Sequence, residues 1–478
     1  MIRPPDLARI GDDVERGLAA AGACGGAVAL VLCDRVWTFV HGEAQPGRRV
    51  TPSTPFHVCS CSKTFTAAVF SQLVQDGAVA WDTPVHTVVP EFEFGDPWVS
   101  AHCTFRDLAS LRVGLTRAGI AEWGIGQNLS REIRLVRARH MDFAAPFRDR
   151  FSYSNLCYIA LSLAAERLAG KPYPDLVQDL ICTPLGLADS YSAGFAVEPG
   201  ADVALPCLPV SGVPTRVRDL TGPNSEGSAR IYLSARDATG WLRFLLAALG
   251  GSDAGPLPSM AVQAMATPHT MVRDADIRLA LQEGGACAYG MGLFVTRLHG
   301  QRLLRHGGGG RGWRHATALA PDARAGVMVM AAAESPAVDA LALQLLEALM
   351  GETAHDWGTP FAQAAAVAAA AERDAIEALF PVDPGAPISS PVTGRYANPV
   401  TGEVRISADG SRMRIVPADA PDFAATLRPL GGAVFDFAFD EPALAPQPLD
   451  PPFRLRVAGG PASPALETSY FGRLVRMT

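Results

Sequence analysis

The sequence predicts an α+β fold in which an antiparallel sheet is flanked by helices and carries an inserted helical region, followed by a small all-β barrel. Apolar, strand-like runs open and close residues 1–351, while helical periodicity dominates the middle of that part. Short alternating segments punctuated by Gly, Pro and Asp fill residues 391–478, a pattern typical of small barrels. Residues 352–390 between these two parts are expected to form a helical and proline-rich linker.

In the first part, an amphipathic helix is expected over residues 5–22, followed by two apolar runs that the polar turn Asp34–Arg35 joins as a β-hairpin. These two strands are expected at 27–34 and 37–42. Three later helices, each ending in glycine, are expected at 62–77, 156–170 and 234–250. Four more strands are expected at 287–296, 302–308, 315–321 and 325–333, and a closing helix at 338–351. Because strands stand at both ends, one antiparallel sheet built from both ends accounts for this order.

The linker is expected to contain an alanine-rich helix over residues 362–379 and a proline-rich exit over 381–391. Beyond it, alternating polar and apolar residues indicate strands that pack one face inward. The barrel strands are expected at 402–410, 411–417, 433–440, 453–460 and 469–477.

Composition narrows the classes of function and the compartment. With 48% hydrophobic and 19% charged residues, the 478-residue chain has ordinary globular composition, and a net charge of −7 argues against nucleic-acid binding. The N-terminus mixes acidic and basic residues before any apolar run, unlike a signal peptide. The uncharged stretch 17–33 holds four glycines and ends as a short buried strand, so we expect no membrane span and a cytoplasmic protein.

The nine cysteines are odd in number and irregular in spacing, which does not indicate a disulfide framework and fits a reducing compartment. Cys59 and Cys61 flank Ser60, but no second Cys or His pair stands at the spacing that a metal site requires. We therefore expect both to be buried packing residues, and we expect no metal and no cofactor.

Ser60 and Lys63 stand three residues apart at a helix start, a spacing that puts both side chains on one face. A serine hydroxyl needs a base to take its proton, and a lysine amine serves when burial and positive neighbours lower its pKa. Among 41 basic residues only Lys63 and Lys171 are lysines, and arginine cannot replace a lysine as base. The pattern alone fits equally well with a helix N-cap serine beside a lysine that reaches for solvent.

Two further motifs favour a catalytic role for Ser60 and Lys63 over a helix cap. The segment FSYSN places Tyr153 and Asn155 just before a helix, where a tyrosine can share proton transfer and an amide can hold Lys63 and a substrate carbonyl. The same Y-x-N pattern at Tyr396-Ala397-Asn398 falls in the barrel, so we treat it as a chance match.

The segment LLRHGGGGRGW begins as a strand and runs into four glycines. We expect His306 at the strand end, with backbone beyond it that a substrate can approach closely. Backbone N–H groups there and at Ser60 would form an oxyanion hole. No helix follows these glycines, which argues against dinucleotide binding, and no G-x-S-x-G occurs, which argues against an α/β-hydrolase.

In this order, S-x-x-K, Y-x-N and H-x-G resemble the serine penicillin-recognising superfamily, which includes class C β-lactamases, DD-peptidases and esterases. H-G-G stands where β-lactamases have K-T-G, so the chain is more similar to the D-aminopeptidase, D-amino-acid amidase and esterase branch. The strings CSCSKTFT, HGGGGRGWR and TGRYANPVTGE are similar to the D-aminopeptidase pattern. The resemblance covers most of residues 20–350 and implies a catalytic serine hydrolase domain over 1–351 and a lipocalin-like barrel over 391–478.

The resemblance also implies roles for individual residues. Ser60 would attack a carbonyl with help from Lys63 and Tyr153, while Asn155 and His306 orient the substrate. The backbone N–H groups of Ser60 and Gly309 would hold the oxyanion. Further substrate-binding residues implied by position are Gly307, Gly308, Trp313, Arg314 and Glu226.

We therefore expect a serine hydrolase that cleaves amide, peptide or ester bonds through a Ser60 acyl-enzyme and prefers D-amino-acid-containing substrates. D-Aminopeptidases carry two barrels and this chain has room for one, a layout similar to penicillin-binding-protein-type thioesterases. The first alternative is thus an acyltransferase that releases or cyclises nonribosomal peptides. The second alternative is a non-catalytic binding or scaffold protein. Expected partners are a small-molecule or peptide substrate, or a carrier-protein-bound peptide, with no nucleic acid and no membrane; the oligomeric state stays open.

Overall fold

The computed structural model describes residues 5–116, 129–193, 201–273, 287–352, 355–388, 393–410, 412–444, 446–458 and 464–477. Within these residues, nine strands form one antiparallel sheet in the order β3-β2-β1-β14-β13-β12-β11-β10-β9. Their bounds are β1 (Gly25–Leu32), β2 (Arg35–Gln45), β3 (Arg48–Arg49), β9 (Thr270–Met271), β10 (Ala288–Tyr289), β11 (Phe294–Leu298), β12 (Gln301–Gly310), β13 (Trp313–Ala320) and β14 (Ala325–Ala331). The pairing of β1 with β14 confirms that both ends of this part build one sheet.

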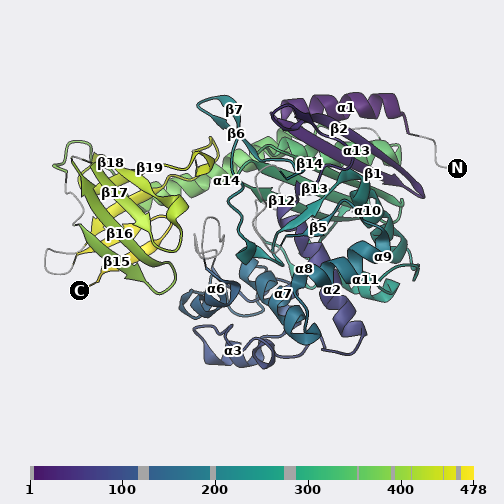
Figure 1. Ribbon diagram of the computed structural model, residues 1–478, viewed down its shortest axis with the longest axis horizontal. Coiled ribbons are helices and arrows are strands. Elements are labelled where there is room, and N and C mark those ends of the chain that lie inside the picture. The colour runs from purple at the N-terminus through teal and green to yellow at the C-terminus, as the bar shows by residue number, and fades with distance from the viewer. Residues whose placement is uncertain are drawn as a thin grey trace.

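Helices cover both faces of this sheet (Figure 1). Their bounds are α1 (Leu7–Ala20), α2 (Ser62–Gln75), α3 (Pro97–His102), α4 (Phe105–Ala109), α6 (Arg131–Arg137), α7 (Asn155–Ala169), α8 (Tyr173–Val177), α9 (Thr183–Leu185), α10 (Ala235–Leu249), α11 (Ser259–Met265), α13 (Ala337–Met350) and α14 (Gly358–Leu379). Helices α1 and α13 pack on one face, and α10 packs on β1 and β14 from the other. The helical region that contains α2 and α7 continues from that second face.

The strand β1 shows why the sheet is covered on both sides. Its alternate residues Ala27, Ala29 and Val31 join the core of the helical region, whereas Val28 and Leu30 join the core beneath α1 and α13. Successive side chains of a strand point to opposite faces, so a strand buried on both faces has an unbroken apolar run in its sequence. That run is the signal by which the sequence predicts this strand.

Two small sheets lie outside the main one and were not expected from the sequence. β4 (Phe56–His57), β8 (Ile231–Leu233) and β5 (Tyr191–Ser192) pair in the order β4-β8-β5. β6 (Cys207–Val210) and β7 (Val213–Arg216) form a hairpin. The first of these sheets fixes the segment that leads into Ser60, because His57 pairs with Tyr232.

The C-terminal strands close into a barrel in which each strand pairs with the next and β15 pairs with β22. Their bounds are β15 (Gly394–Asn398), β16 (Gly402–Asp409), β17 (Arg412–Pro417), β18 (Ala425–Gly431), β19 (Val434–Phe439), β20 (Arg454–Ala458), β21 (Ala465–Thr468) and β22 (Gly472–Arg476). Helix α14 leads from the main body to this barrel (Figure 1). The predicted fold class, an α+β body with a C-terminal barrel, is confirmed. Tyr396 of the chance Y-x-N match is a fully buried barrel residue.

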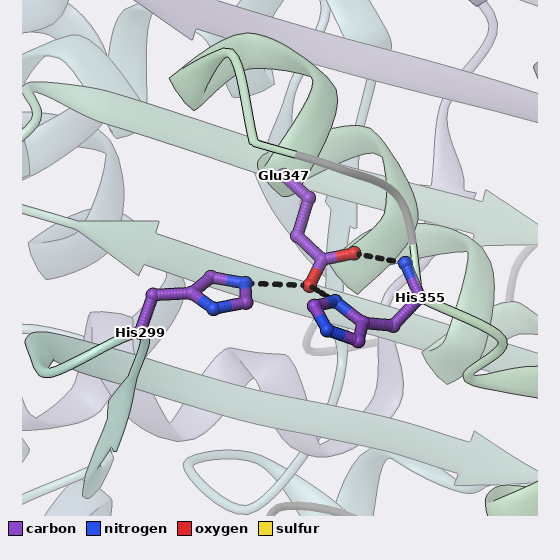
Figure 2. A group of neighbouring side chains, drawn as sticks. All are labelled: His299, Glu347 and His355. Atoms are coloured by element: carbon purple, nitrogen blue, oxygen red, sulfur yellow. Dashed lines mark hydrogen bonds and ion pairs between the residues drawn. The ribbon is translucent and has the colours of Figure 1, made fainter.

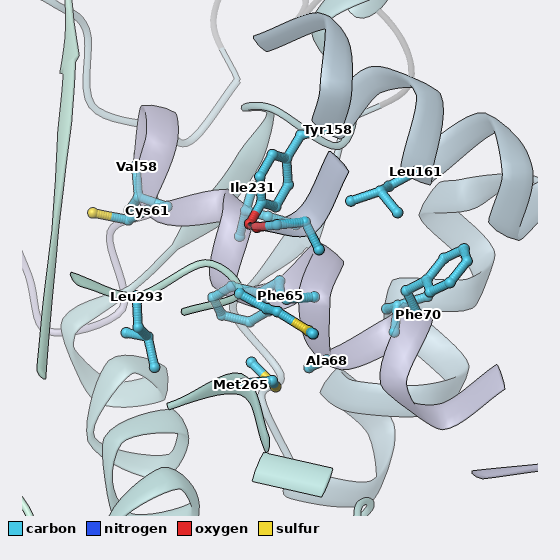
Figure 3. Packing of buried hydrophobic residues seen from close by; sticks show 14 of the residues in the cluster. Val58, Cys61, Phe65, Ala68, Phe70, Tyr158, Leu161, Ile231, Met265 and Leu293 are labelled. Atoms are coloured by element: carbon cyan, nitrogen blue, oxygen red, sulfur yellow. Dashed lines mark hydrogen bonds between the residues drawn. The ribbon is translucent and has the colours of Figure 1, made fainter. Parts of the chain in front are cut away.

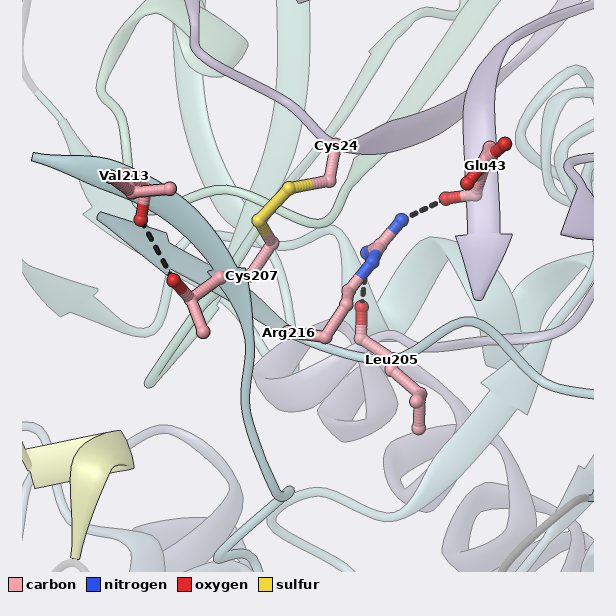
Figure 4. The surroundings of a disulfide bond; sticks show 7 residues. Cys24, Glu43, Leu205, Cys207, Val213 and Arg216 are labelled. Carbon is pink, nitrogen blue, oxygen red and sulfur yellow. Dashed lines mark hydrogen bonds between the residues drawn. A yellow bond between two sulfur atoms is a disulfide. The ribbon is translucent and has the colours of Figure 1, made fainter. Parts of the chain in front are cut away.

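A disulfide joins Cys24 to Cys207, so the expectation of unpaired cysteines is wrong for these two (Figure 4). They are 183 residues apart, and spacing along the chain therefore carries no signal of the bond. The fold brings them together because the segment before β1 lies beside β6. Arg216 reinforces this junction by donating to the Leu205 carbonyl at 2.6 Å and to the Glu43 carbonyl.

Among the described residues, no helix has both the length and the apolar character that crossing a membrane requires.

Candidate active site

Ser60 and Lys63 lie at the head of α2, the former in a short 3-10 turn over Cys59–Cys61. Lys63 is fully buried, whereas Ser60 is partly exposed. The Lys63 ammonium donates to Ser60 Oγ at 3.0 Å. Nearly all of α2 is buried, and Phe65 lies among residues such as Tyr158 and Leu161 of α7 (Figure 3). The lysine is therefore held on a buried helix next to the partly exposed serine.

Lys63 makes further contacts with two other segments. Nζ donates to Asn155 Oδ1 at 2.7 Å and to the Ser228 carbonyl at 2.9 Å. It also lies 4.8 Å from the centre of the Tyr153 ring, within cation–π range. Asn155 is the first residue of α7, so three separate segments converge on one buried charge.

The cysteines on either side of Ser60 are buried, as expected, with 3% of Cys59 and 4% of Cys61 exposed. Burial raises the pKa of the Cys61 thiol to about 12, and burial also raises that of Cys59. Both are thus thiols at neutral pH, which disfavours them as nucleophiles. Cys59 has φ of +48°, a backbone region that costs a residue with a side chain, so the turn before Ser60 is strained.

His306 does not end its strand, contrary to the prediction. β12 continues through Gly310 and pairs residue by residue with β13, for example Gly309 with Arg314. The physical reason is that the glycines let the strand pass close over the turn that holds Ser60. A Cβ on Gly308 would lie 2.3 Å from the Val58 carbonyl oxygen, and one on Gly310 would lie 3.3 Å from Cys59 Sγ.

The ring of His306 is buried and has partners at both nitrogens. Nδ1 donates to the Gly307 carbonyl at 2.7 Å, which leaves Nε2 to accept from the Tyr289 hydroxyl at 3.2 Å. Burial, together with the positive charge of Lys63, lowers the pKa of His306 to about 3. The ring is therefore neutral and packs 6.5 Å from the Tyr153 ring, centre to centre. The His306 ring thus lies next to that of Tyr153, and its predicted part in orienting the substrate stays a prediction.

Other predicted residues lie around this group in different ways. Trp313 is 1% exposed and packs edge-on against Phe56 and His57, below the turn that holds Ser60. Arg314 forms an ion pair with Asp339 at 2.6 Å.

Glu226 has its contacts with α6 and α7. Its carboxylate lies 3.0 Å from the Arg131 guanidinium, and its backbone carbonyl accepts from Ser162. Its predicted part in substrate binding stays a prediction, as do those of Gly307, Gly308, Trp313 and Arg314.

Three residues around the site were not predicted from the sequence. Tyr158 stands one turn after Asn155 on α7, and its ring centre lies 5.6 Å from Lys63 Nζ, so the three-residue spacing was a usable signal. The Ser228 carbonyl accepts a hydrogen bond from Lys63, and the Tyr289 hydroxyl, on strand β10, donates to His306 Nε2. Neither of these two carries a sequence pattern that points to Lys63 or His306.

Comparison with known sequences identifies the family. The Beta-lactamase family model matches residues 11–351. The chain belongs to the Beta-lactamase family. This confirms the resemblance seen in the sequence and places the chain in a family of serine hydrolases, within which D-aminopeptidases and D-amino acid amidases are similar to it.

Curated relatives include two fungal proteins and several bacterial ones. Unguisins hydrolase ungD' of Aspergillus campestris is 34% identical over 46% of this chain and 44% of its own length. Unguisins hydrolase ungD of Aspergillus violaceofuscus is 26% identical over 76% of this chain and 69% of its own. D-Aminopeptidase of Brucella canis is 27% identical over 68% and 60%. The matches thus span between 44% and 69% of the length of these relatives.

Solved structures extend the likeness of the fold to the barrel. The octameric penicillin-binding protein homologue from Pyrococcus abyssi has a TM-score of 0.63 at 18% identity and covers 98% of this chain and 100% of its own. D-Amino acid amidase from Ochrobactrum anthropi has a TM-score of 0.57 at 21% identity and covers 72% and 98%. At these identities the likeness shows the fold alone.

Proposed function

We propose that this chain hydrolyses amide bonds of peptides that contain D-amino acids, through an acyl-enzyme formed on Ser60. One observation carries the proposal: a buried lysine lies 3.0 Å from the hydroxyl of a partly exposed serine. A serine becomes a nucleophile when an adjacent base takes its proton, and this pair has the geometry for that transfer. The names of the relatives, D-aminopeptidase and D-amino acid amidase among them, support the substrate class.

The proposed first step begins with Lys63 as a neutral amine. Ser60 Oγ bonds to the substrate carbonyl carbon while its proton passes to Lys63 Nζ, and the carbonyl oxygen becomes an oxyanion. The backbone N–H groups of Ser60 and Gly309 would stabilise that oxyanion. Collapse then breaks the C–N bond, and the leaving amine takes the proton through Lys63 and Tyr153.

Water completes the cycle in the proposed hydrolase. It attacks the ester carbonyl of the acyl-enzyme and gives one proton to the Lys63–Tyr153 pair; that proton then passes to Ser60 Oγ as the acyl C–O bond breaks, so the acid leaves and both Ser60 and neutral Lys63 are restored. Asn155 would keep Nζ aimed at the serine during both steps, because its amide oxygen already accepts from Nζ at 2.7 Å.

Peptide cyclisation or transfer is the second candidate, because the acyl-enzyme is the same and only the acceptor differs. The observation that favours it is the single barrel joined through α14, a layout similar to that of penicillin-binding-protein-type thioesterases. An amine of the acyl chain, in place of water, would then take the acyl group.

The test compares D-alanine p-nitroanilide, L-alanine p-nitroanilide and a peptidyl thioester with a D-residue at the acyl position. Wild type is expected to release p-nitroaniline from the D-substrate at least tenfold faster than from the L-substrate, and intact mass is expected to show an acyl adduct on Ser60. Ser60→Ala should lose both, whereas Ser53→Ala, a change in the exposed loop before β4, should keep both.

Each other outcome has a distinct meaning. Equal rates on both stereoisomers would remove the D-preference but keep the acyl-enzyme. A cyclic product from the thioester, with little free acid, would favour the transferase. Absence of any adduct from all three donors would exclude both and leave a binding protein.

A further inference from the structure

A second group of chemically active side chains lies away from Ser60, at the far face of the sheet where α13 packs. His299, Glu347 and His355 meet there (Figure 2). Glu347 Oε1 lies 2.7 Å from His299 Nε2 and 2.8 Å from His355 Nδ1. All three potential ligand atoms lie within 4.8 Å of one another.

These residues come from three segments. His299 occupies the two-residue turn between β11 and β12, in which His299 and Gly300 have φ of 50° and 72°. Positive φ at both positions is the geometry of a tight type I′ hairpin. Glu347 lies in the last turn of α13, and His355 stands just before α14. The fold, not the spacing, has assembled the group.

The carboxylate at the centre is fixed in place. Glu347 is fully buried, with 0% of its side chain exposed. Its second oxygen accepts from the His355 backbone N–H at 3.0 Å, so the shared oxygen faces the two rings. The rings themselves stack with centres 5.0 Å apart and planes at 28°, and Trp357 packs beside His355. A buried carboxylate held between two imidazoles is a preorganised donor set.

We propose that His299, Glu347 and His355 bind one divalent transition-metal ion, zinc above all, as a structural site that fastens the start of α14 to the main body. Two imidazole nitrogens and one carboxylate oxygen form a ligand set that suits Zn²⁺. Bonds of about 2.0–2.1 Å put tetrahedral ligand atoms about 3.3 Å apart. The two imidazole–carboxylate distances, now 2.7 and 2.8 Å, would open by about half an ångström, and the two ring nitrogens, which lie within 4.8 Å of each other, would adjust to the same spacing.

The proton balance of this step is simple. Without metal, His299 Nε2 and His355 Nδ1 each carry the proton that they donate to the carboxylate. When the metal binds, the proton on each coordinating nitrogen leaves, to the other ring nitrogen or to solvent, and the metal takes the place of the two N–H donors. The group therefore gains a 2+ charge against one carboxylate, with water completing the coordination.

The position of the site indicates its use. Helix α14 carries the chain from the body to the barrel, and His355 is the last of the three ligands before it. A metal here would hold the root of the linker and thereby limit how the barrel moves relative to the sheet. The site lies beside α13, whose buried residues pack in a core cluster separate from that of α2 and α7, so the inference is independent of the proposed hydrolysis.

The experiment uses the whole chain, stripped with a chelator and then exchanged into metal-free buffer. Zn²⁺ is titrated calorimetrically, and Co²⁺ is added separately to record its visible absorption, which reports coordination number. Wild type is expected to bind one Zn²⁺ per chain and to give the intense visible bands of four-coordinate Co²⁺. Thermal unfolding should shift upward with Zn²⁺, because a ligand that binds only the folded state stabilises it.

His355→Gln and Glu347→Gln test the ligands. Both should lose the Co²⁺ bands and weaken Zn²⁺ binding by more than tenfold, since even changes to residues that only support a metal ligand cost about 10–100-fold. His355 is 56% exposed, so its variant is expected to fold even if the change at buried Glu347 prevents folding. His86→Gln, at an exposed histidine on another element, is the matched control and should bind as wild type does.

Two results would overturn the inference. If wild type binds Zn²⁺ no more tightly than His355→Gln does, the three residues form only a hydrogen-bonded group and no metal site. If all variants bind Zn²⁺ equally and keep the Co²⁺ bands, the metal sits elsewhere. Ester or anilide hydrolysis by chelated wild type is measured in parallel, and its loss or survival changes neither conclusion about the metal.

Discussion

At the scale of single residues, the buried charge of Lys63 dominates the candidate active site. Three neutral oxygens, those of Ser60, Asn155 and the Ser228 carbonyl, accept hydrogen bonds from Nζ. Burial disfavours the charged form of a lysine, and in the proposed mechanism Lys63 takes the proton of Ser60 as the neutral amine.

Lys63→Arg keeps a positive charge but cannot accept a proton, because the guanidinium stays protonated. Hydrolysis of D-alanine p-nitroanilide should fall by about 10²–10⁴-fold in kcat/KM, the usual contribution of a general base. Lys171→Arg is the matched control, since this exposed lysine pairs with Asp179 at 2.8 Å and should tolerate the change. Activity of Lys63→Arg within tenfold of wild type would exclude Lys63 as the base.

Glu226 gives a second prediction, on stability against pH. Burial raises the pKa of its carboxyl to about 7, with Arg131 lowering it and Glu166 raising it. The folded chain therefore holds this proton between pH 4.5 and 7, where the unfolded chain has released it. More protons bound in the folded state mean that the free energy of unfolding falls as pH rises through this window.

Glu226→Gln removes that titration and should match wild type closely at about pH 4.5, where both side chains are neutral in the folded chain. By about pH 8 the variant should have gained about 3 kcal/mol in unfolding free energy relative to wild type. Urea unfolding at both pH values measures the difference. A difference that does not change with pH would show that Glu226 ionises in the folded protein as easily as in the unfolded one.

At the scale of elements, the approach of β12 to the turn over Cys59–Cys61 decides the shape of the site. Gly308 allows it, because any Cβ there would lie 2.3 Å from the Val58 carbonyl oxygen. The Cys61 thiol, 3.6 Å from the His306 carbonyl, completes the contact. Close contacts of main-chain atoms therefore set the position of β12 relative to the turn that holds Ser60.

Gly308→Ala should force these two backbones apart. We expect a loss of about 2–3 kcal/mol in unfolding free energy, the cost of an overpacked core, together with a large drop in kcat/KM. Gly307→Ala is the control for stability, since its Cβ would meet Asp339 Oδ1 at 3.6 Å, an ordinary contact. Urea unfolding of both variants measures the effect, and equal stability of the two would refute the close approach.

At the scale of the whole molecule, the hairpin of β6 and β7 connects three parts. Cys207 is bonded to Cys24 beside β1, and its N–H donates to the Gly312 carbonyl at the tip of β12 and β13. Leu208 packs in the core cluster of the barrel. The β6–β7 hairpin therefore contacts the main sheet near β1, the β12–β13 hairpin that contains Gly307–Gly310, and the barrel, and the disulfide lies at this junction.

Cys24→Ser should lower the free energy of unfolding by about 3 kcal/mol, because the bond closes a long loop in the unfolded chain. Cys33→Ser, at a free and partly exposed cysteine, is the control and should change stability little. Urea unfolding with and without dithiothreitol measures both. Wild type whose stability is the same with and without the reductant would contradict a stabilising bond.

The sequence by itself determined the features that depend on neighbours along the chain. The spacing of Ser60 and Lys63 puts them one helical turn apart, and the apolar runs of β1 and β14 identify buried strands, because both signals repeat with the local period of a helix or strand. Asn155 is found from its place at a helix start. The roles of these side chains stay proposals, but the contacts of Ser60 and Asn155 with Lys63 agree with the site that S-x-x-K and Y-x-N predict together.

Only the tertiary structure decided the features that depend on distant segments. The residues next to Gly308 in the sequence do not indicate that the Val58 carbonyl lies close to it in the fold. The sequence therefore predicts that the strand ends at His306, whereas the glycines continue the strand. The partners of His306, the Cys24–Cys207 bond and the group of His299, Glu347 and His355 have the same origin. Each of these features joins residues that lie far apart in the sequence, at separations that follow neither the helix nor the strand period. Only long-range packing brings such residues into contact.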